Sequence, residues 1–294
     1  MQGWREEMED AHLALPDFDP ERGLSLFGVF DGHGGEVVAQ LVSERLPETL
    51  RGLPEYREGR FQEALFKAFM AQDDYLRSPE GRRMLAKRKA NAMGMGSTAV
   101  VALLNASKRE LFVANCGDSR AVLVSGKGAV AMSQDHSPLL PAELQRIRRA
   151  GGTVNREGRV DGNLNLSRAI GDLFYKRNRA LGPEAQLITA VPEVRRRALG
   201  AHDRYLLLGC DGVWERFTNQ QVVDFLLPRP PDPGRSAWDW AEELPSHPVL
   251  GSDPRLPAGR LSVACSAFLD RAPPSESRVH LCSDPKPLLA LGLA

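Results

Sequence analysis

The sequence predicts an α+β fold whose strands form antiparallel sheets. Several apolar segments are short and bounded by turn residues, which is typical of antiparallel strands. Other segments repeat apolar residues at the spacing of a helix that packs one face against a core. The strand candidates are residues 24–30, 98–104, 111–115, 120–124 and 205–210, and the helix candidates are residues 36–46, 61–70 and 137–150.

The first strand candidate, residues 24–30, ends at a glycine-rich corner that runs from Asp31 to Gly35. Residues 36–46 follow it with apolar side chains about one helical turn apart. The corner combines a carboxylate, an accessible glycine backbone and an imidazole, so it could hold a metal. Taken alone, such a corner is equally typical of an ordinary tight turn.

The middle of the chain supplies a helix and then three strands. Residues 61–70 carry apolar side chains at helical spacing, and the strand candidates between residues 98 and 124 follow. The second of these strands leads into Cys116, Gly117 and Asp118, so an aspartate again follows a strand and a glycine. This repeats the arrangement at Asp31.

The last two elements are a basic helix and a further strand. Residues 137–150 are predicted to form the helix, which stops at Gly151 and Gly152. The strand over residues 205–210 runs directly into Asp211 and a glycine. Three strands therefore end near an aspartate. Mg²⁺ and Mn²⁺ prefer oxygen ligands, so this repetition favours a divalent-cation site over a simple turn.

With these motifs in order, the sequence resembles the metal-dependent serine/threonine protein phosphatases of the 2C type, the PPM family. The resemblance covers residues 1–227 and implies a four-layer sandwich of two antiparallel β-sheets flanked by α-helices, incomplete here at both ends. The matching segments are residues 1–5, 9–12, 30–35, 96–100, 114–120, 135–136, 151–154, 166–172 and 210–214.

The resemblance implies two Mn²⁺ or Mg²⁺ ions per active site. Asp31 would bridge both ions, and the carbonyl of Gly32 would contact one. Glu9 and Asp211 would hold the other ion directly or through water, and Asp10 would support them. A weaker third ion would use Asp118, Asp211 and Glu215, where Glu215 replaces the aspartate that is usual in the family.

The resemblance also implies the reaction, which is hydrolysis of phosphoserine and phosphothreonine proteins by a water that bridges the two metals. Arg5 would bind the phosphate, because a guanidinium can hold two phosphoryl oxygens. His33 would be the general acid that protonates the leaving oxygen. The alternatives are a solvated arginine and a histidine that caps the following helix.

Other residues of the matching region are predicted to act indirectly. Arg168 and Asp172 are interpreted as residues that organise a loop. A substrate-facing flap should follow them, in which Lys176, Arg177 and Arg179 could attract phosphoproteins. An ordinary solvated cationic loop is an equally good interpretation.

Composition places further limits on function. The 294 residues carry 38 basic and 38 acidic side chains, which gives no bias toward nucleic acid. No apolar run is long enough for a membrane span or a signal core. Four cysteines without metal-pair spacing are consistent with reduced thiols. We therefore expect a monomer in the cytoplasm or nucleus that does not bind membranes.

A cysteine-dependent phosphatase is the rival chemistry, because Cys210 and Cys265 are each followed by an arginine six residues later. Acidic side chains lie inside both segments, and they would repel the phosphate that such a loop must hold. Both spacings are therefore interpreted as accidental.

The two ends depart from the family pattern. Residues 228–294 hold 12 of the 21 prolines and are predicted to be a disordered tail. No Asp-Asn dipeptide, which should complete the second metal's ligands, occurs in the chain, and the chain begins inside the first signature. We hypothesise a truncated or alternatively spliced product, or an imperfect gene model. Two functions follow: an active phosphatase, and a weakened or inactive module that binds phosphoproteins.

Overall fold

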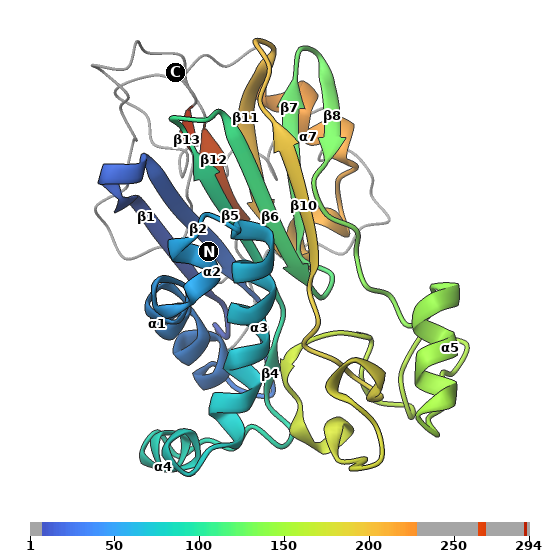
Figure 1. Ribbon diagram of the computed structural model, residues 1–294. Coiled ribbons are helices and arrows are strands. Elements are labelled where there is room, and N and C mark those ends of the chain that lie inside the picture. The colour runs from blue at the N-terminus through green and yellow to red at the C-terminus, as the bar shows by residue number, and fades with distance from the viewer. Residues whose placement is uncertain (1–7, 228–263, 269–290, 293–294) are drawn as a thin grey trace.

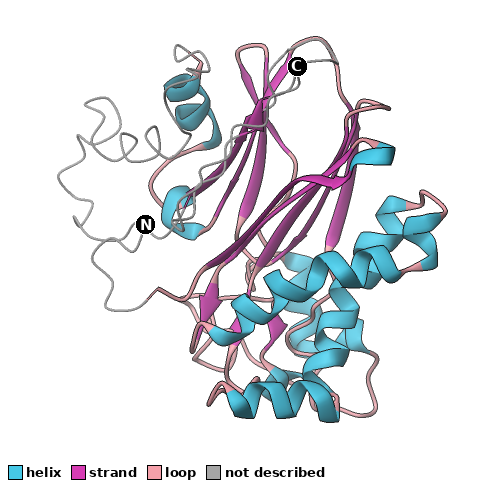
Figure 2. Cartoon of the chain, turned by 90° about the vertical axis from the view of Figure 1, so that its left-hand side faces the viewer, coloured by secondary structure: helices cyan, strands magenta, loops and turns pink. Residues whose placement is uncertain are grey.

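The computed structural model describes residues 8–227, 264–268 and 291–292. Two antiparallel sheets lie face to face between layers of helices (Figures 1 and 2). Helices α1 (Val37–Gly52) and α3 (Phe61–Arg77) cover the first sheet, and α7 (Asn219–Leu226) packs beside the second. This arrangement confirms the predicted α+β sandwich.

The first sheet has the order β1-β2-β5-β6-β10, and the second has the order β12-β11-β7-β8. The first consists of β1 (Ala11–Asp19), β2 (Leu24–Phe30), β5 (Ala99–Asn105), β6 (Glu110–Cys116) and β10 (Glu193–Ala198). The second consists of β7 (Arg120–Ser125), β8 (Gly128–Ala131), β11 (Asp203–Gly209) and β12 (Ala264–Phe268), and β13 (Leu291–Gly292) also pairs with β11.

A small third sheet consists of β3 (Gly32–His33), β4 (Gly96–Ser97) and β9 (Ile170–Gly171). The remaining helices are short. They are α2 (Pro54–Arg57), α4 (Pro79–Lys87), α5 (Pro141–Arg149) and α6 (Asp211–Trp214), with 3-10 turns η1 (Pro20–Arg22), η2 (Leu173–Lys176) and η3 (Pro183–Ala185).

The central strands are mostly apolar, and side chains on both of their faces are buried. In β2, Leu26 faces the helical layer and Phe27 faces the second sheet. In β11, Leu206 faces the first sheet and Leu207 packs with α7. Successive side chains of a strand point to opposite faces, so each central strand contributes to two cores.

Helices α1 and α3 run on to Gly52 and Arg77, past the predicted ends at residues 46 and 70, and the predicted start of the basic helix is wrong. The basic helix α5 begins at Pro141 instead of residue 137. Leu140, which precedes that proline, has ψ 136°, an extended conformation. A residue before proline is disfavoured in the helical region, so the helix cannot extend back through Leu140.

Most of the predicted proline-rich tail lies outside the described residues. Within it, the structure describes β12 and β13, which pair with β11. None of the helices in the described part of the chain combines the length and apolar character that crossing a membrane requires.

Candidate active site

Asp31 directly follows the end of β2. Its backbone amide and its backbone carbonyl each form a hydrogen bond with Thr98. The Thr98 amide donates to the Asp31 carbonyl at 2.9 Å, and the Asp31 amide donates to Thr98 Oγ1 at 3.2 Å. Thr98 Oγ1 also lies 2.7 Å from Ser119 Oγ, beside Asp118. These bonds hold the ends of three strands together, so the carboxylates that follow them are fixed in position.

Gly32 lets the acidic N-terminal segment approach this strand end. A Cβ atom at residue 32 would lie only 2.2 Å from the carbonyl oxygen of Glu9. Any side chain there would push the Glu9 backbone away. The predicted neighbours Glu9 and Gly32 are therefore in direct contact, and Asp10 follows beside them.

A compact ligand group forms where these segments meet. Potential ligand atoms of Asp31, Cys210 and Asp211 lie within 4.8 Å of one another. Asp10 joins the group through a hydrogen bond between its side chain and that of Asp31, and it accepts a bond from the Cys210 thiol at 3.8 Å. Sequence reasoning missed Cys210, although it directly precedes Asp211.

The carboxylates of this group repel one another. Burial, followed by the charges of Asp10, Asp211 and Asp118, raises the pKa of Asp31 well above its usual range. Burial and the charges of Asp211 and Asp135 raise the pKa of Asp118 to about 7. A divalent cation would relieve this repulsion, and the carboxylates of the group, unlike the Cys210 sulfur, are the oxygen ligands that Mg²⁺ and Mn²⁺ prefer. The residues present therefore fit such a cation.

Asp118 owes its position to a bonded loop. Gly117, at φ 118°, packs against Thr98, where a Cβ would come within 2.6 Å. The amide of Gly117 donates to His136 Nδ1 at 3.1 Å, and the His136 amide donates back to the Gly117 carbonyl at 2.9 Å. Burial, helped by nearby arginines, lowers the pKa of His136 to about 3, so the ring stays neutral and can accept this bond.

His33 is held by Asp172 from a distant part of the chain. His33 Nε2 lies 2.6 Å from Asp172 Oδ2, and Asp172 is 2% exposed. Burial lowers the pKa of His33, but the bond to Asp172 and the charges of Asp172, Asp118 and Glu9 raise it more, so the net shift is upward. The imidazole therefore keeps a proton more readily than a free histidine.

Backbone geometry at two residues keeps this pair together. Asp172 has φ 48°, a left-handed conformation that is uncommon for residues other than glycine. A Cβ at Gly96 would lie 2.3 Å from Asp172 Oδ2 and 2.6 Å from His33 Nε2. The third sheet thus needs glycine at position 96 to leave room for the pair.

A buried ion pair supports the turn that carries Asp172. Lys176 Nζ donates to Asp73 Oδ2 at 2.6 Å and to the Ala169 carbonyl at 2.8 Å. Asp73 Oδ1 accepts from the amide of Gly171 at 2.8 Å. Lys176 is 4% exposed, so the expectation that it attracts phosphoproteins from a flap is wrong.

Arg168 belongs to a second buried network. Its guanidinium donates to Glu143 Oε1 at 2.5 Å, and Glu143 also accepts from Ser167 and Arg146. Burial raises the pKa of Glu143, but the arginine and serine bonds outweigh burial and lower it to about 2. Arg168 thus organises the loop before Asp172, as the sequence suggested.

Glu143→Gln should destabilise the protein by on the order of 3 kcal/mol at pH 7, since the partly buried Arg146 and Arg168 would lose their shared, buried counter-charge. A folded-state pKa below the unfolded value gives stability that is present above about pH 4.5 and is lost as the pH falls toward 2. The difference from wild type should therefore shrink in acid. Urea unfolding at pH 7 and pH 3.5 measures the difference in unfolding free energy between variant and wild type, and Glu157→Gln, at an exposed position, is the control. A pH-independent difference would contradict the assignment.

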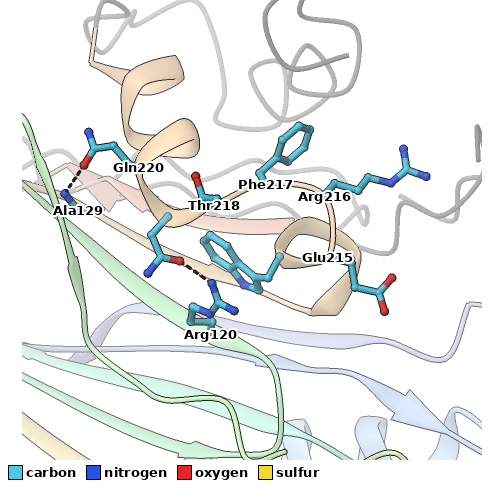
Figure 3. A pocket seen from close by; sticks show the side chains of 9 residues that line it. Arg120, Ala129, Glu215, Arg216, Phe217, Thr218 and Gln220 are labelled. Atoms are coloured by element: carbon cyan, nitrogen blue, oxygen red, sulfur yellow. Dashed lines mark hydrogen bonds between the residues drawn. The ribbon is translucent and has the colours of Figure 1, made fainter. Parts of the chain in front are cut away.

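Glu215 lies apart from the ligand group. It is exposed, one turn beyond Asp211, and its amide donates to the Asp211 carbonyl at 2.8 Å. It lines a shallow pocket with Arg120 and residues 214–220, and its carboxylate is directed away from Arg120 (Figure 3). Arg5 lies outside the described residues, so its predicted role stays a prediction.

Comparison with known proteins agrees with a site that combines a group of carboxylates with a histidine held by Asp172. Residues 1–229 match the model of the family described as Protein phosphatase 2C. The chain belongs to the protein phosphatase 2C family. It is therefore a protein phosphatase by descent, and the resemblance inferred from the motifs is confirmed.

Relatives and solved structures of the protein phosphatase 2C family agree. "Probable protein phosphatase 2C 2" of Paramecium tetraurelia is 48% identical over 226 residues, which cover 76% of this chain and 74% of the relative. "Probable protein phosphatase 2C 60" of Arabidopsis thaliana is 36% identical, and the match covers 92% of this chain and 78% of the relative. A crystal structure of serine-threonine phosphatase 2C from Toxoplasma gondii shares the fold, with TM-score 0.65, 23% identity and coverage of 77% and 80%.

Proposed function

We propose that this chain is a metal-dependent protein serine/threonine phosphatase that hydrolyses phosphoserine and phosphothreonine directly, without a phosphoenzyme. The observation that carries the proposal is the group of mutually repelling carboxylates beside a histidine held by Asp172. The substrates would be phosphoproteins. The phosphatase domain would span residues 1–227, followed by a separate proline-rich segment.

The carboxylate group would hold the cations. Asp31, the carbonyl of Gly32, Glu9 and Asp211 would be ligands, with Asp10 in support. Asp118 and Glu215 would serve a weaker third ion. When bound, Mn²⁺ or Mg²⁺ ions supply a Lewis acid that activates water and neutralises phosphoryl oxygens.

Residues of the chain itself would bind the phosphate of the substrate and supply a proton to the leaving oxygen. Arg5 would grip two phosphoryl oxygens and fix the phosphorus in line with the attacking water. As the water oxygen bonds to phosphorus, the bond to the serine oxygen breaks and its electron pair stays on that oxygen. His33 would donate a proton to it. Asp172 binds Nε2, so Nδ1 is the ring nitrogen available for this transfer.

The alternative is a weakened or inactive phosphoprotein-binding module, and the absence of an Asp-Asn dipeptide favours it. The deciding experiment measures Mn²⁺-dependent release of phosphate from a phosphothreonine peptide, with EDTA as control. Turnover that EDTA abolishes supports the enzyme. Peptide binding without turnover by the folded chain supports the module.

His33→Gln should slow hydrolysis of a phosphoserine peptide about a hundredfold, because an alkoxide leaves poorly without a proton. The same change should affect p-nitrophenyl phosphate far less, since nitrophenolate leaves readily. Steady-state kinetics on both substrates tests this. Exposed His202→Gln is the matched control, and equal losses on both substrates would rule out the general-acid role.

A further inference from the structure

A groove with five basic residues among the eleven that line it lies beside the turn that carries Asp172. It runs between the α3–α4 hairpin and the segment that follows Asp172, and its volume is about 480 Å³. Leu76, Leu85, Ala92 and Leu173 line its floor, and all four are buried. We call it the arginine groove, after Arg77, Arg82, Arg177 and Arg179, which line it.

The arginine groove is positive in a protein whose formal net charge is zero. Among the residues that the structure describes, no acidic side chain lines it, and its lysine, Lys176, is neutralised by Asp73. Within the described part of the chain, Arg82 and Arg179 are exposed and form no ion pair or side-chain hydrogen bond. Two guanidinium groups are therefore available to an anionic ligand.

The other two arginines are held in place. Arg77 donates to the Lys176 carbonyl at 3.2 Å and lies 3.6 Å from Asp73. Arg177 stacks on the exposed ring of Phe174, with 4.8 Å between the guanidinium carbon and the ring centroid. The groove thus combines two arginines that are held in place with two that are free, above a floor of buried apolar side chains.

Backbone hydrogen bonds connect the groove to the pair formed by His33 and Asp172. The amides of Asp172, Leu173 and Phe174 donate to the carbonyls of Met95, Ala92 and Met93 at 2.9, 2.9 and 3.0 Å. Asp172 holds His33, whereas Leu173, Ala92 and Met93 line the groove. A polypeptide whose phosphorylated residue reaches His33 could therefore place its flanking residues in the groove.

We propose that the arginine groove binds an acidic segment that flanks the phosphorylated residue of the substrate protein. This inference rests on the proposed function and adds a substrate class to it. Complementary charge is the reason: carboxylates of the segment would pair with the exposed guanidinium groups of Arg82 and Arg179.

Two phosphothreonine peptides of equal length test the proposal, one with aspartate and glutamate flanks and one with asparagine and glutamine flanks. Fluorescence anisotropy in EDTA measures binding without turnover. The wild type should bind the acidic peptide about fivefold to tenfold tighter, as two exposed charge contacts would allow. The double variant Arg82→Gln/Arg179→Gln should reduce this ratio below about twofold, and high salt should do the same.

Arg148→Gln/Arg149→Gln removes the same charge from exposed positions of α5 and is the matched control. An unchanged ratio in the groove variant, or an equal loss in the control, would overturn the proposal. Turnover of p-nitrophenyl phosphate with Mn²⁺ should be unaffected by either variant. Groove-dependent binding without any Mn²⁺-dependent turnover would refute the proposed function while leaving the acidic-peptide site intact.

Discussion

Asp31→Asn should abolish Mn²⁺-dependent hydrolysis of p-nitrophenyl phosphate, with a loss on the order of a thousandfold or more. Asp31 is central to the carboxylate group, and asparagine keeps its shape but removes the charge that attracts the cations. The same change should leave the protein at least as stable as wild type in EDTA, because it relieves repulsion with Asp10 and Asp211. Activity and thermal unfolding are both measured.

The two readouts distinguish a metal role from a folding role. Mn²⁺ should raise the Tm of the wild type, because a ligand that binds only the folded state stabilises it, and it should not raise that of the variant. Asp17→Asn, exposed near the opposite end of β1, should behave like wild type. A variant that is less stable in EDTA and still responds to Mn²⁺ would contradict this account.

Asp73→Asn should destabilise the protein by about 3 to 5 kcal/mol, since it leaves the buried ammonium of Lys176 without a counter-charge. Asparagine also weakens the acceptor for the Gly171 amide. The turn that presents Asp172 to His33 would then be less well held, so kcat for a phosphoserine peptide should fall as well. Urea unfolding and steady-state kinetics measure the two effects.

A second variant separates charge burial from positioning. Asp73→Leu/Lys176→Met replaces the pair with apolar side chains and should recover much of the stability. It cannot restore a bond to Gly171, so the defect in kcat on the peptide should persist. Asp74→Asn, the exposed neighbour on α3, is the control. Full recovery of both stability and kcat would show that Asp73 does not position the turn.

Local patterns accounted for most of the fold. The apolar run bounded by turn residues predicts a strand over residues 24–30, and β2 has these bounds in the structure. Helix α4 was missed because it is only nine residues long and strongly polar, although Ser78 and Pro79 form a recognisable start and Ser78 caps the Gly81 amide. Short polar helices are stabilised by their ends and their packing, which periodicity does not detect.

The site was less accessible to sequence reasoning wherever its partners are far apart in the chain. His33 and Asp172 are separated by 139 residues, and Lys176 and Asp73 by 103. No spacing rule relates such positions, so the sequence predicts an indirect role for Asp172 but neither its bond to His33 nor the burial of Lys176 against Asp73. The carboxylates were found because each one follows its own strand or signature.

The third sheet has a consequence for how the protein becomes active. Its strands begin at residues 32, 96 and 170, and the ligand group adds residues 10 and 211. Contacts of such long sequence separation form slowly, because the loops between them must close first. We therefore expect a refolding chain to regain most of its secondary structure before it regains the ligand group, so that recovery of activity would report completion of the whole sandwich.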